Sequence, residues 1–479
     1  MKRNVILFGA GNNAGEAIKR YGREKIAFLA DNAKEKIGTA IEGYQVISFD
    51  EMCRLHSSGH IIVITPDKNA FLIGQLEMAG IFDYLIFQKE DRNLFIEEKI
   101  KAEERYRENN EILLDFIKRV QSLDLIQDTS EFRGICNEVL EKNREGLVLF
   151  WSGWENEGAY YGNLKSILTH AELPEEDALY FPTVSHEDCS PLFSPAFKYR
   201  SAVVFSGEYY KKKVQEHRPY IPVFTVGPYI SYARGIYNDK KVAELKEKNG
   251  RTLLVFLPHS LEYVGRLYDK RQFIDKVLEL YQRDFKHIML CSYWADINDP
   301  ACGYAQERGI KVVSAGFRFD EDFDRRLRTI IELSDAVVCG DMGTHISYSL
   351  SLGKPVGRVE ISNNQVIRDE EMSSDLERTL EFSGDYEQFF RGFFKYFDEN
   401  IKLTQEQLIW MNPVSGFDKI RNQEYLRKIS RISKDIWKKC RGDLNLYVGG
   451  VMETYHEYEK NQEFDLMVML KDAVGSCLF

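Results

Sequence analysis

The amino-acid sequence predicts an α/β fold built from parallel sheets, with a helical region at the C-terminal end. Short apolar runs, typical of strands that are buried on both faces, alternate with helical patterns between residues 1 and 90. The alternation begins again near residue 145 and a further series of strands begins near residue 253. Because parallel strands need a crossover between them, each series indicates a doubly wound sheet of its own.

The first series is a Rossmann-like unit with its elements in regular order. Its first strand, Val5–Phe8, runs directly into the glycine turn Gly9-Ala10-Gly11-Asn12-Asn13-Ala14-Gly15. The expected strands are residues 5–8, 26–29, 46–47, 61–64 and 84–87, and the expected helices are residues 15–21, 50–55 and 71–79. A strand, a glycine turn and a helix in this order predict a nucleotide-binding sheet edge.

Composition narrows the class of protein. The chain has 479 residues and a net charge of −11, which argues against general nucleic-acid binding because a phosphate backbone demands a basic face. No apolar run is long enough for a transmembrane helix, and the N-terminal residues lack the pattern of a signal segment. The eight cysteines form no Cys-x-x-Cys pair, so we expect no zinc site and a reducing, cytoplasmic location.

The rest of the chain divides into four predicted regions. A helical linker is expected at residues 91–124, followed by a first Rossmann-like half at residues 125–240 and a second at residues 250–360. The expected strands are residues 147–150, 202–205 and 223–226 in the first half, and residues 253–256, 288–290, 311–313 and 336–338 in the second. Residues 361–479 are expected to be mostly helical and to pack on both halves.

The N-terminal turn has the residues of a phosphate site. Gly9, Gly11 and Gly15 would allow a tight turn, a close approach of backbone to phosphate and packing of the helix. Asn12 and Asn13 open the helix, and Asp31, at the end of the second strand, lies where a ribose-binding acid is expected. The glycine spacing is one residue longer than the dinucleotide pattern, which disfavours NAD. A nucleotide, a nucleotide-sugar or no ligand at all remain as alternatives, and an NAD-dependent enzyme that works from residues 1–90 stays open as a further one.

Residues 1–90 resemble the N-terminal domain of bacterial sugar acyltransferases of the hexapeptide-repeat class. The segments that carry the resemblance are Ile6-Leu7-Phe8-Gly9-Ala10-Gly11, Phe28-Leu29-Ala30-Asp31-Asn32, Gly43-Tyr44-Gln45-Val46-Ile47 and Gln75-Leu76-Glu77-Met78-Ala79-Gly80-Ile81. The resemblance implies a module that binds a nucleotide-linked sugar. The left-handed repeats that perform acyl transfer are absent from this sequence, so that activity is not implied.

Two polar segments follow strands of the second half, where the carboxyl ends of parallel strands gather ligands. His259 and Ser260 come after the strand at residues 253–256, where the histidine could contact phosphate, act as an acid or base, or cap a helix. The run Gly343-Thr344-His345-Ile346-Ser347 comes after the strand at residues 336–338 and opens a helix. Backbone N–H groups, hydroxyls and an imidazole at a helix start are suited to a diphosphate.

These segments, together with Leu352-Gly353-Lys354-Pro355, resemble the donor half of glycosyltransferases with the two-domain GT-B architecture. Gly227-Pro228-Tyr229-Ile230 and Leu290-Cys291-Ser292-Tyr293-Trp294-Ala295-Asp296-Ile297 resemble bacterial surface-polysaccharide members. The resemblance implies that a nucleotide-sugar donor binds without a metal or other cofactor and that a glycan or glycoconjugate is the acceptor. Glu360 is the nearest acid that could hold the donor ribose, since Leu350 and Ser351 occupy the usual region.

The acceptor side would supply the catalytic base. Glu155 and Glu157, in a glycine-containing loop after the strand at residues 147–150, are the first candidates, and residues 186–188 are rivals. Arginines at 318, 325, 326 and 328 either steer a phosphorylated donor or balance the acidic residues around them. A phosphotransferase, a nucleotide-sugar epimerase and a non-catalytic nucleotide-sugar scaffold stay open as alternatives. Oligomerisation and peripheral association with membrane assembly machinery also stay open.

Overall fold

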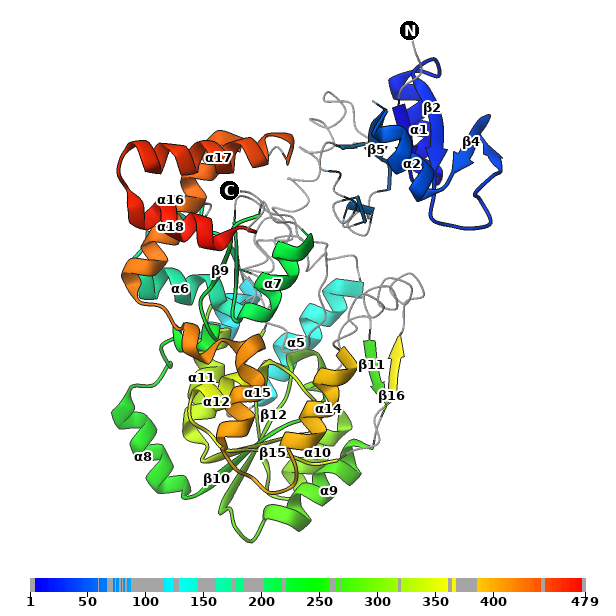
Figure 1. Cartoon of the computed structure of the whole chain (residues 1–479). Coiled ribbons are helices and arrows are strands. Elements are labelled where there is room, and N and C mark those ends of the chain that lie inside the picture. The colour runs from blue at the N-terminus through cyan, green and yellow to red at the C-terminus, as the bar shows by residue number, and fades with distance from the viewer. Residues whose placement is uncertain are drawn as a thin grey trace.

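The fold was analysed in a computed structural model of the chain (Figure 1). It describes residues 5–58, 60–66, 72–73, 75–76, 79, 81, 84–87, 115–123, 129–144, 161–174, 177–178, 180–184, 202–217, 221–258, 264–267, 269–317, 320–360, 364–367, 386–440 and 444–475. Among these residues no helix combines the length and apolar character needed to cross a bilayer.

The N-terminal sheet is a Rossmann-like, mostly parallel sheet, as the sequence predicts. Its strands are β1 (Val5–Phe8), β2 (Ile26–Ala30), β3 (Ala40–Ile41), β4 (Tyr44–Ile47), β5 (Ile61–Ile64) and β6 (Leu85–Ile86). They lie in the order β3-β4-β2-β1-β5-β6, and all pairs are parallel except β3 with β4. Helix α1 (Asn12–Tyr21) begins directly after Gly11, three residues before the predicted start, and α2 (Phe49–His56) follows β4.

The two faces of this sheet have separate cores. Along β1, Val5 and Leu7 point into one core, whereas Ile6 and Phe8 point into the other, as the alternation of side chains in a strand requires. No member of either core lies beyond Phe87 in the sequence. The described residues of this sheet therefore form a hydrophobic unit of their own.

The second half contains a five-stranded parallel sheet. Its strands are β10 (Thr252–Phe256), β12 (His287–Cys291), β13 (Lys311–Val313), β14 (Ala336–Cys339) and β15 (Val356–Arg358), in the order β13-β12-β10-β14-β15. The chain therefore builds outward on one side of β10 and then on the other. Ligands of such sheets bind at the point where the direction reverses, which here lies between the carboxyl ends of β10 and β14.

Helices cover both faces of this sheet. They include α9 (Lys270–Tyr281), α10 (Pro300–Glu307), α11 (Phe323–Leu333) and α12 (Thr344–Ser351), and α8 (Asp239–Asn249) leads into β10. A small antiparallel pair, β11 (Val264–Leu267) with β16 (Asn364–Ile367), was not predicted from the sequence, and neither was β15. Both β11 and β16 mix polar and apolar residues, so neither has the continuous apolar run of a buried strand.

The first half has a smaller described sheet. Strands β7 (Thr183–Val184), β8 (Val203–Phe205) and β9 (Val223–Thr225) are parallel, with helices α6 (Asn163–Ala171) and α7 (Glu208–His217) beside them. The strand predicted at residues 147–150 lies outside the described residues. Helix α5 (Thr129–Arg144), which the sequence assigns to this half, buries Phe132 and Val139 in the core of the second half, together with Phe116 from the predicted linker.

The C-terminal helices pack on both halves. Helices α14 (Tyr386–Tyr396) and α15 (Gln405–Ser415) contribute Phe393 and Met411 to a core of the second half. Helices α16 (Gln423–Cys440), α17 (Leu444–Lys460) and α18 (Phe464–Ala473) contribute to the core of the first half. Two Rossmann-like halves joined by C-terminal helices that return to the first half form the GT-B arrangement, as the sequence predicts (Figure 1).

After α15 the chain passes from the second half back to the first, and glycines allow close backbone contacts at this crossing. A Cβ atom on Gly416 would lie 2.1 Å from the carbonyl oxygen of Ser206, and one on Gly207 would lie 2.3 Å from that of Pro413. Gly416 also has a φ of +65°, in the left-handed region that favours glycine. The end of α15 therefore lies against the turn between β8 and α7 with no room for a side chain between them.

Replacement of Gly416 by alanine should destabilise the protein far more than replacement of Gly353. Both glycines have a positive φ, +65° and +71°, but a Cβ on Gly353 would meet no atom within 4 Å. The left-handed backbone costs alanine about 1–2 kcal/mol at either position, and only Gly416→Ala adds a steric clash. Thermal unfolding of both variants provides the comparison, and an equal loss of melting temperature would contradict the close contact.

Candidate functional site

The clearest candidate site lies at the carboxyl edge of the second-half sheet, where α12 begins. Gly343 is the N-cap residue of α12, has extended backbone and, as a glycine, offers no capping side chain. Residues 343–345 are partly exposed, whereas residues 346–350 are buried. The helix thus presents its first N–H groups at the surface while its body is held in the core, an arrangement suited to an anion.

The imidazole of His345 is positioned by a ring from the neighbouring strand. It stacks on Phe256, the last residue of β10, with 4.8 Å between ring centroids and 24° between planes. Gly343 leaves space for this ring, because a Cβ there would lie 2.9 Å from Cε1 and Nδ1 of His345. Since β10 and β14 are neighbours, the stack places His345 at the point where the strand order reverses.

The other residues predicted to bind the nucleotide-sugar donor lie in different environments. Thr344 is partly exposed beside His345, and Glu360 is exposed two residues beyond the end of β15. Ser347 is fully buried, and Ser349 donates its hydroxyl to the carbonyl of His345 over 2.6 Å. Glu360 therefore shares the carboxyl edge with the helix start, whereas the Ser347 hydroxyl lies beneath the surface.

Lys354, in the Gly-Lys-Pro segment after α12, points away from the helix start. Its ammonium donates to the carbonyls of Glu332 and Ser334, at 3.1 and 2.5 Å, at the C-terminal end of α11. Burial lowers the pKa of Lys354 to about 8, and Lys246 nearby lowers it as well. This lysine caps a neighbouring helix, where the helix dipole favours a cation.

The arginine cluster is balanced by its acidic neighbours at the three positions that the structure describes. Arg326 and Asp320 form a fully buried pair at 2.6 Å, and Gln121 also donates to Asp320 over 3.0 Å. Arg325 pairs with Asp322 and Arg328 pairs with Glu332, at 2.6 and 2.7 Å. These arginines organise the start and the face of α11. Arg318 lies outside the described residues.

The remaining predicted site residues, catalytic and phosphate-binding, lie outside the described residues. They are His259 and Ser260, which follow Pro258 beyond the end of β10, and Glu155, Glu157 and residues 186–188 on the acceptor side. Their roles stay predictions. The described residues contain no group of three or more histidine, cysteine, aspartate or glutamate side chains arranged to hold a metal ion.

The N-terminal glycine turn packs on and hydrogen-bonds to its own sheet. A Cβ on Gly9, whose φ is +109°, would lie 2.5 Å from the ring of Pro66, so the turn packs against the end of β5. The side-chain Nδ2 of Asn13 donates to the carbonyl of Thr65 over 3.0 Å. Gly11, the N-cap residue of α1, and Asn12 are exposed, and a Cβ on Gly15 would make only an ordinary contact with Glu42.

The carboxylate of Asp31 holds this turn from the neighbouring strand. It accepts hydrogen bonds from the backbone N–H groups of Ala10 and Ala33, at 2.8 and 2.9 Å, and from Lys36 at 3.0 Å. Burial raises the pKa of Asp31, but these three donors outweigh burial and the net pKa is lowered. Both oxygens therefore already have protein partners at the position expected for a ribose-binding acid.

A buried carboxyl lies where the two halves meet. A Cβ on Gly162, at the start of α6, would lie 2.9 Å from Oδ1 of Asp324 on α11 and 2.2 Å from the carbonyl oxygen of Glu321. Burial raises the pKa of Asp324 to about 7, with the Ser166 hydroxyl and the Arg325 amide acting in the opposite direction. The contact between the halves thus contains a group that titrates near neutral pH.

Local sequence signals did not reveal two of these contacts. Phe256 follows from a strand pattern, but its stacking on His345 depends on the neighbouring positions of β10 and β14. Asp324 lies in a charged stretch that predicts a solvated helix face, and only the approach of α6 buries it. An aromatic residue at a strand end beside a predicted ligand edge is the one signal that could have indicated the first contact.

Comparisons with known proteins add distant structural similarities. No protein-family model matches the sequence, and no curated protein matches it significantly. The chain is similar to the UDP-GlcNAc 2-epimerase from Neisseria meningitidis bound to UDP-GlcNAc, with 11% identity, a TM-score of 0.27 and coverage of 89% of this chain and 97% of that one.

Two further solved structures show the same level of similarity. S. aureus MnaA with UDP has 12% identity and a TM-score of 0.26, and the match covers 93% of this chain and 98% of that one. Arabidopsis thaliana UGT89C1 has 10% identity, a TM-score of 0.24 and coverage of 93% and 98%. The fold assignment rests on the chain's own strand order and on its C-terminal crossing.

The Asp324→Asn variant should lose a pH dependence of stability that the wild type has. Because folding raises the pKa of Asp324 from 3.8 to about 7, its contribution to stability is complete below pH 3.8 and is lost as the pH rises through about 7. The difference between wild type and variant in melting temperature should therefore change between pH 4 and 7. Asp284→Asn, at an exposed position in the same half, is the control. Parallel pH profiles for wild type and Asp324→Asn would contradict burial of the carboxyl.

Proposed function

We propose that the chain is a glycosyltransferase that moves a sugar from a nucleotide-activated donor to a glycan or glycoconjugate acceptor. One observation carries the proposal. The start of α12 is surface-accessible at the reversal point of a parallel sheet, with an imidazole stacked in place beside it. A diphosphate is the group in a nucleotide-sugar that such a site would bind.

In the proposed reaction, an acceptor hydroxyl oxygen attacks the anomeric carbon of the donor sugar. The bond between that carbon and the diphosphate oxygen breaks, and both electrons leave with the diphosphate. The α12 amides, Thr344 and His345 stabilise the departing charge, and His259 and Ser260 are assigned to the same edge. Glu155 or Glu157 takes the acceptor proton. Glu360 is the proposed partner of the donor ribose.

We assign no catalytic role to the N-terminal sheet or to NAD. The exposed Gly11 and Asn12 leave the start of α1 open to a nucleotide-sugar, whereas Asp31 is already bonded within the protein. We assign the protein to the cytoplasm and to assembly of surface polysaccharide, where such donors are used. No metal or other cofactor is part of the proposed chemistry.

Replacement of His345 by alanine should weaken binding of nucleoside diphosphates about 10–100-fold, the effect of losing a hydrogen bond to a charged group. His287→Ala is the matched control, because His287 lies at the amino end of β12, on the opposite edge of the same sheet. Calorimetric titration with UDP, GDP, dTDP and ADP measures the effect.

Incubation with labelled nucleotide-sugars then tests the activity itself. Transfer of label to a glycan acceptor, lost in His345→Ala and kept in His287→Ala, is the expected result. An isomerised sugar that forms without an acceptor would indicate an epimerase instead. Full donor affinity and turnover in His345→Ala would refute the proposed site.

A further inference from the structure

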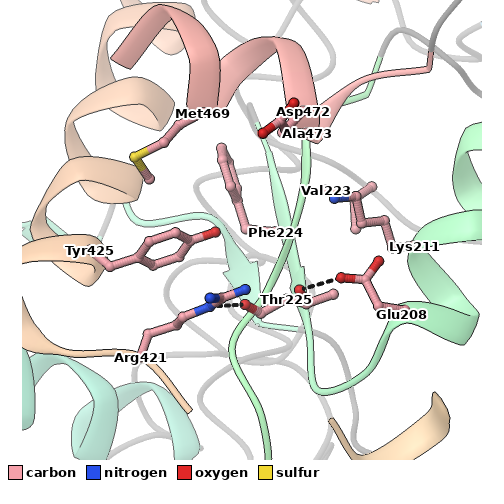
Figure 2. Close-up of a pocket in the computed structure, with 10 residues that line it drawn as sticks. All are labelled: Glu208, Lys211, Val223, Phe224, Thr225, Arg421, Tyr425, Met469, Asp472 and Ala473. Atoms are coloured by element: carbon pink, nitrogen blue, oxygen red, sulfur yellow. Dashed lines mark hydrogen bonds between the residues drawn. The ribbon is translucent and has the colours of Figure 1, made fainter. Parts of the chain in front are cut away.

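The first half contains a cavity of about 440 Å³ that is distinct from the donor edge. Figure 2 shows its walls, which are α7 with Glu208 and Lys211, strand β9, and the C-terminal helices α16 and α18. None of the lining residues belongs to residues 252–360, which contain the α12 site. A volume of this order lies in the range of small-molecule sites.

Lys211 lines this cavity, and its positively charged ammonium forms no ion pair among the described residues. Its side chain is partly buried, and none of the carboxylates in the described part of the chain lies within salt-bridge distance of its ammonium. Burial lowers the pKa of Lys211, although Glu208 and Asp472 act at longer range in the opposite direction. A partly desolvated ammonium of this kind favours an anionic partner.

Arg421 adds a second cation in a fixed orientation. Its Nε donates to the carbonyl of Thr225 over 3.0 Å, and its guanidinium lies 4.6 Å from the ring centroid of Tyr425. Figure 2 shows the arginine held between the strand and the tyrosine. Among the described residues these contacts use only Nε as a donor, which leaves the terminal nitrogens available for a carboxylate or phosphate.

Acidic and apolar groups complete the wall. Glu208 accepts a hydrogen bond from the Thr225 hydroxyl at 3.0 Å and lies 3.6 Å from the ammonium of Lys419. Asp472 is exposed at the rim, and Phe224 and Met469 supply apolar surface. The carboxylates can accept hydrogen bonds from hydroxyl groups, of which a sugar carries several.

We propose that this cavity binds a monosaccharide-sized anion, a sugar that bears a phosphate or a carboxylate. The anionic group would lie between Lys211 and Arg421, and the sugar hydroxyls would donate to Glu208 and Asp472. A neutral sugar would leave the Lys211 ammonium without an anionic partner. Inorganic phosphate alone would offer fewer hydroxyl groups to the two carboxylates and no carbon skeleton to contact Phe224 and Met469. This site is additional to the proposed donor site and lies in the other half.

Titration of the full-length protein with glucose 6-phosphate, glucuronate, glucose and inorganic phosphate tests the proposal. Both acidic sugars should bind, each at least tenfold more tightly than glucose or phosphate alone. Lys211→Met should weaken binding of the acidic sugars at least tenfold, because it removes the cation and keeps the length of the side chain. Lys212→Met, at the exposed neighbouring position on α7, should leave binding unchanged.

The outcome separates this site from the donor site. Binding of UDP, GDP, dTDP and ADP should be the same in Lys211→Met as in the wild type, and this comparison also shows that the variant is folded. Glucose 6-phosphate and glucuronate distinguish a phosphorylated sugar from an acidic glycan residue as the preferred form. Absence of binding by both, equal binding of inorganic phosphate, or full affinity in Lys211→Met would overturn the proposal.

Discussion

The structure of the two halves depends on one close backbone contact, where the end of α15 meets the turn between β8 and α7. Met411 belongs to the core of the second half and Val414, less than one helical turn later, belongs to the core of the first. Gly207 and Gly416 provide the room for this contact. A single helical turn thus joins two cores, and a side chain at either glycine would push them apart.

Hydrogen bonds fix the chain as it leaves this contact. The backbone N–H of Arg421 donates to the hydroxyl of Tyr232 over 2.9 Å, and its side chain bonds to the carboxyl end of β9. Tyr232 in turn donates to the carbonyl of Val226, and burial raises its pKa to about 12, so the hydroxyl keeps its proton. The crossing therefore also positions Arg421 in the wall of the first-half cavity.

The sheets could be predicted from the sequence because buried parallel strands are continuous apolar runs. Leu253–Phe256 and Ala336–Val338 are such runs, and the structure places both within strands of one sheet. The start of α12 was also predictable, since glycine and threonine both occur at N-cap positions, and Gly343 takes that position. In contrast, β11 and β16 are short and mixed in polarity, and they pair across a long stretch of chain.

Side-chain roles were harder to predict than strands, because they depend on distant partners. Lys354 follows a glycine in a segment typical of donor sites, yet it caps α11 through the carbonyls of Glu332 and Ser334. Asp31 stands at the position of a ribose-binding acid, yet it bonds to Ala10, Ala33 and Lys36. Lys211 and Arg421 meet at one cavity although no local pattern relates them.

The central claim is that the start of α12 binds the diphosphate of a nucleotide-sugar. Hydrogen–deuterium exchange of the full-length protein, with and without a saturating nucleotide-sugar, tests this claim directly. The account predicts slower exchange of the amides at residues 343–345, which would donate to the ligand, while the rate at residues 340–342 changes less. Ligand-dependent protection confined to the N-terminal turn at residues 9–15, or no protection at α12 under saturation, would contradict it.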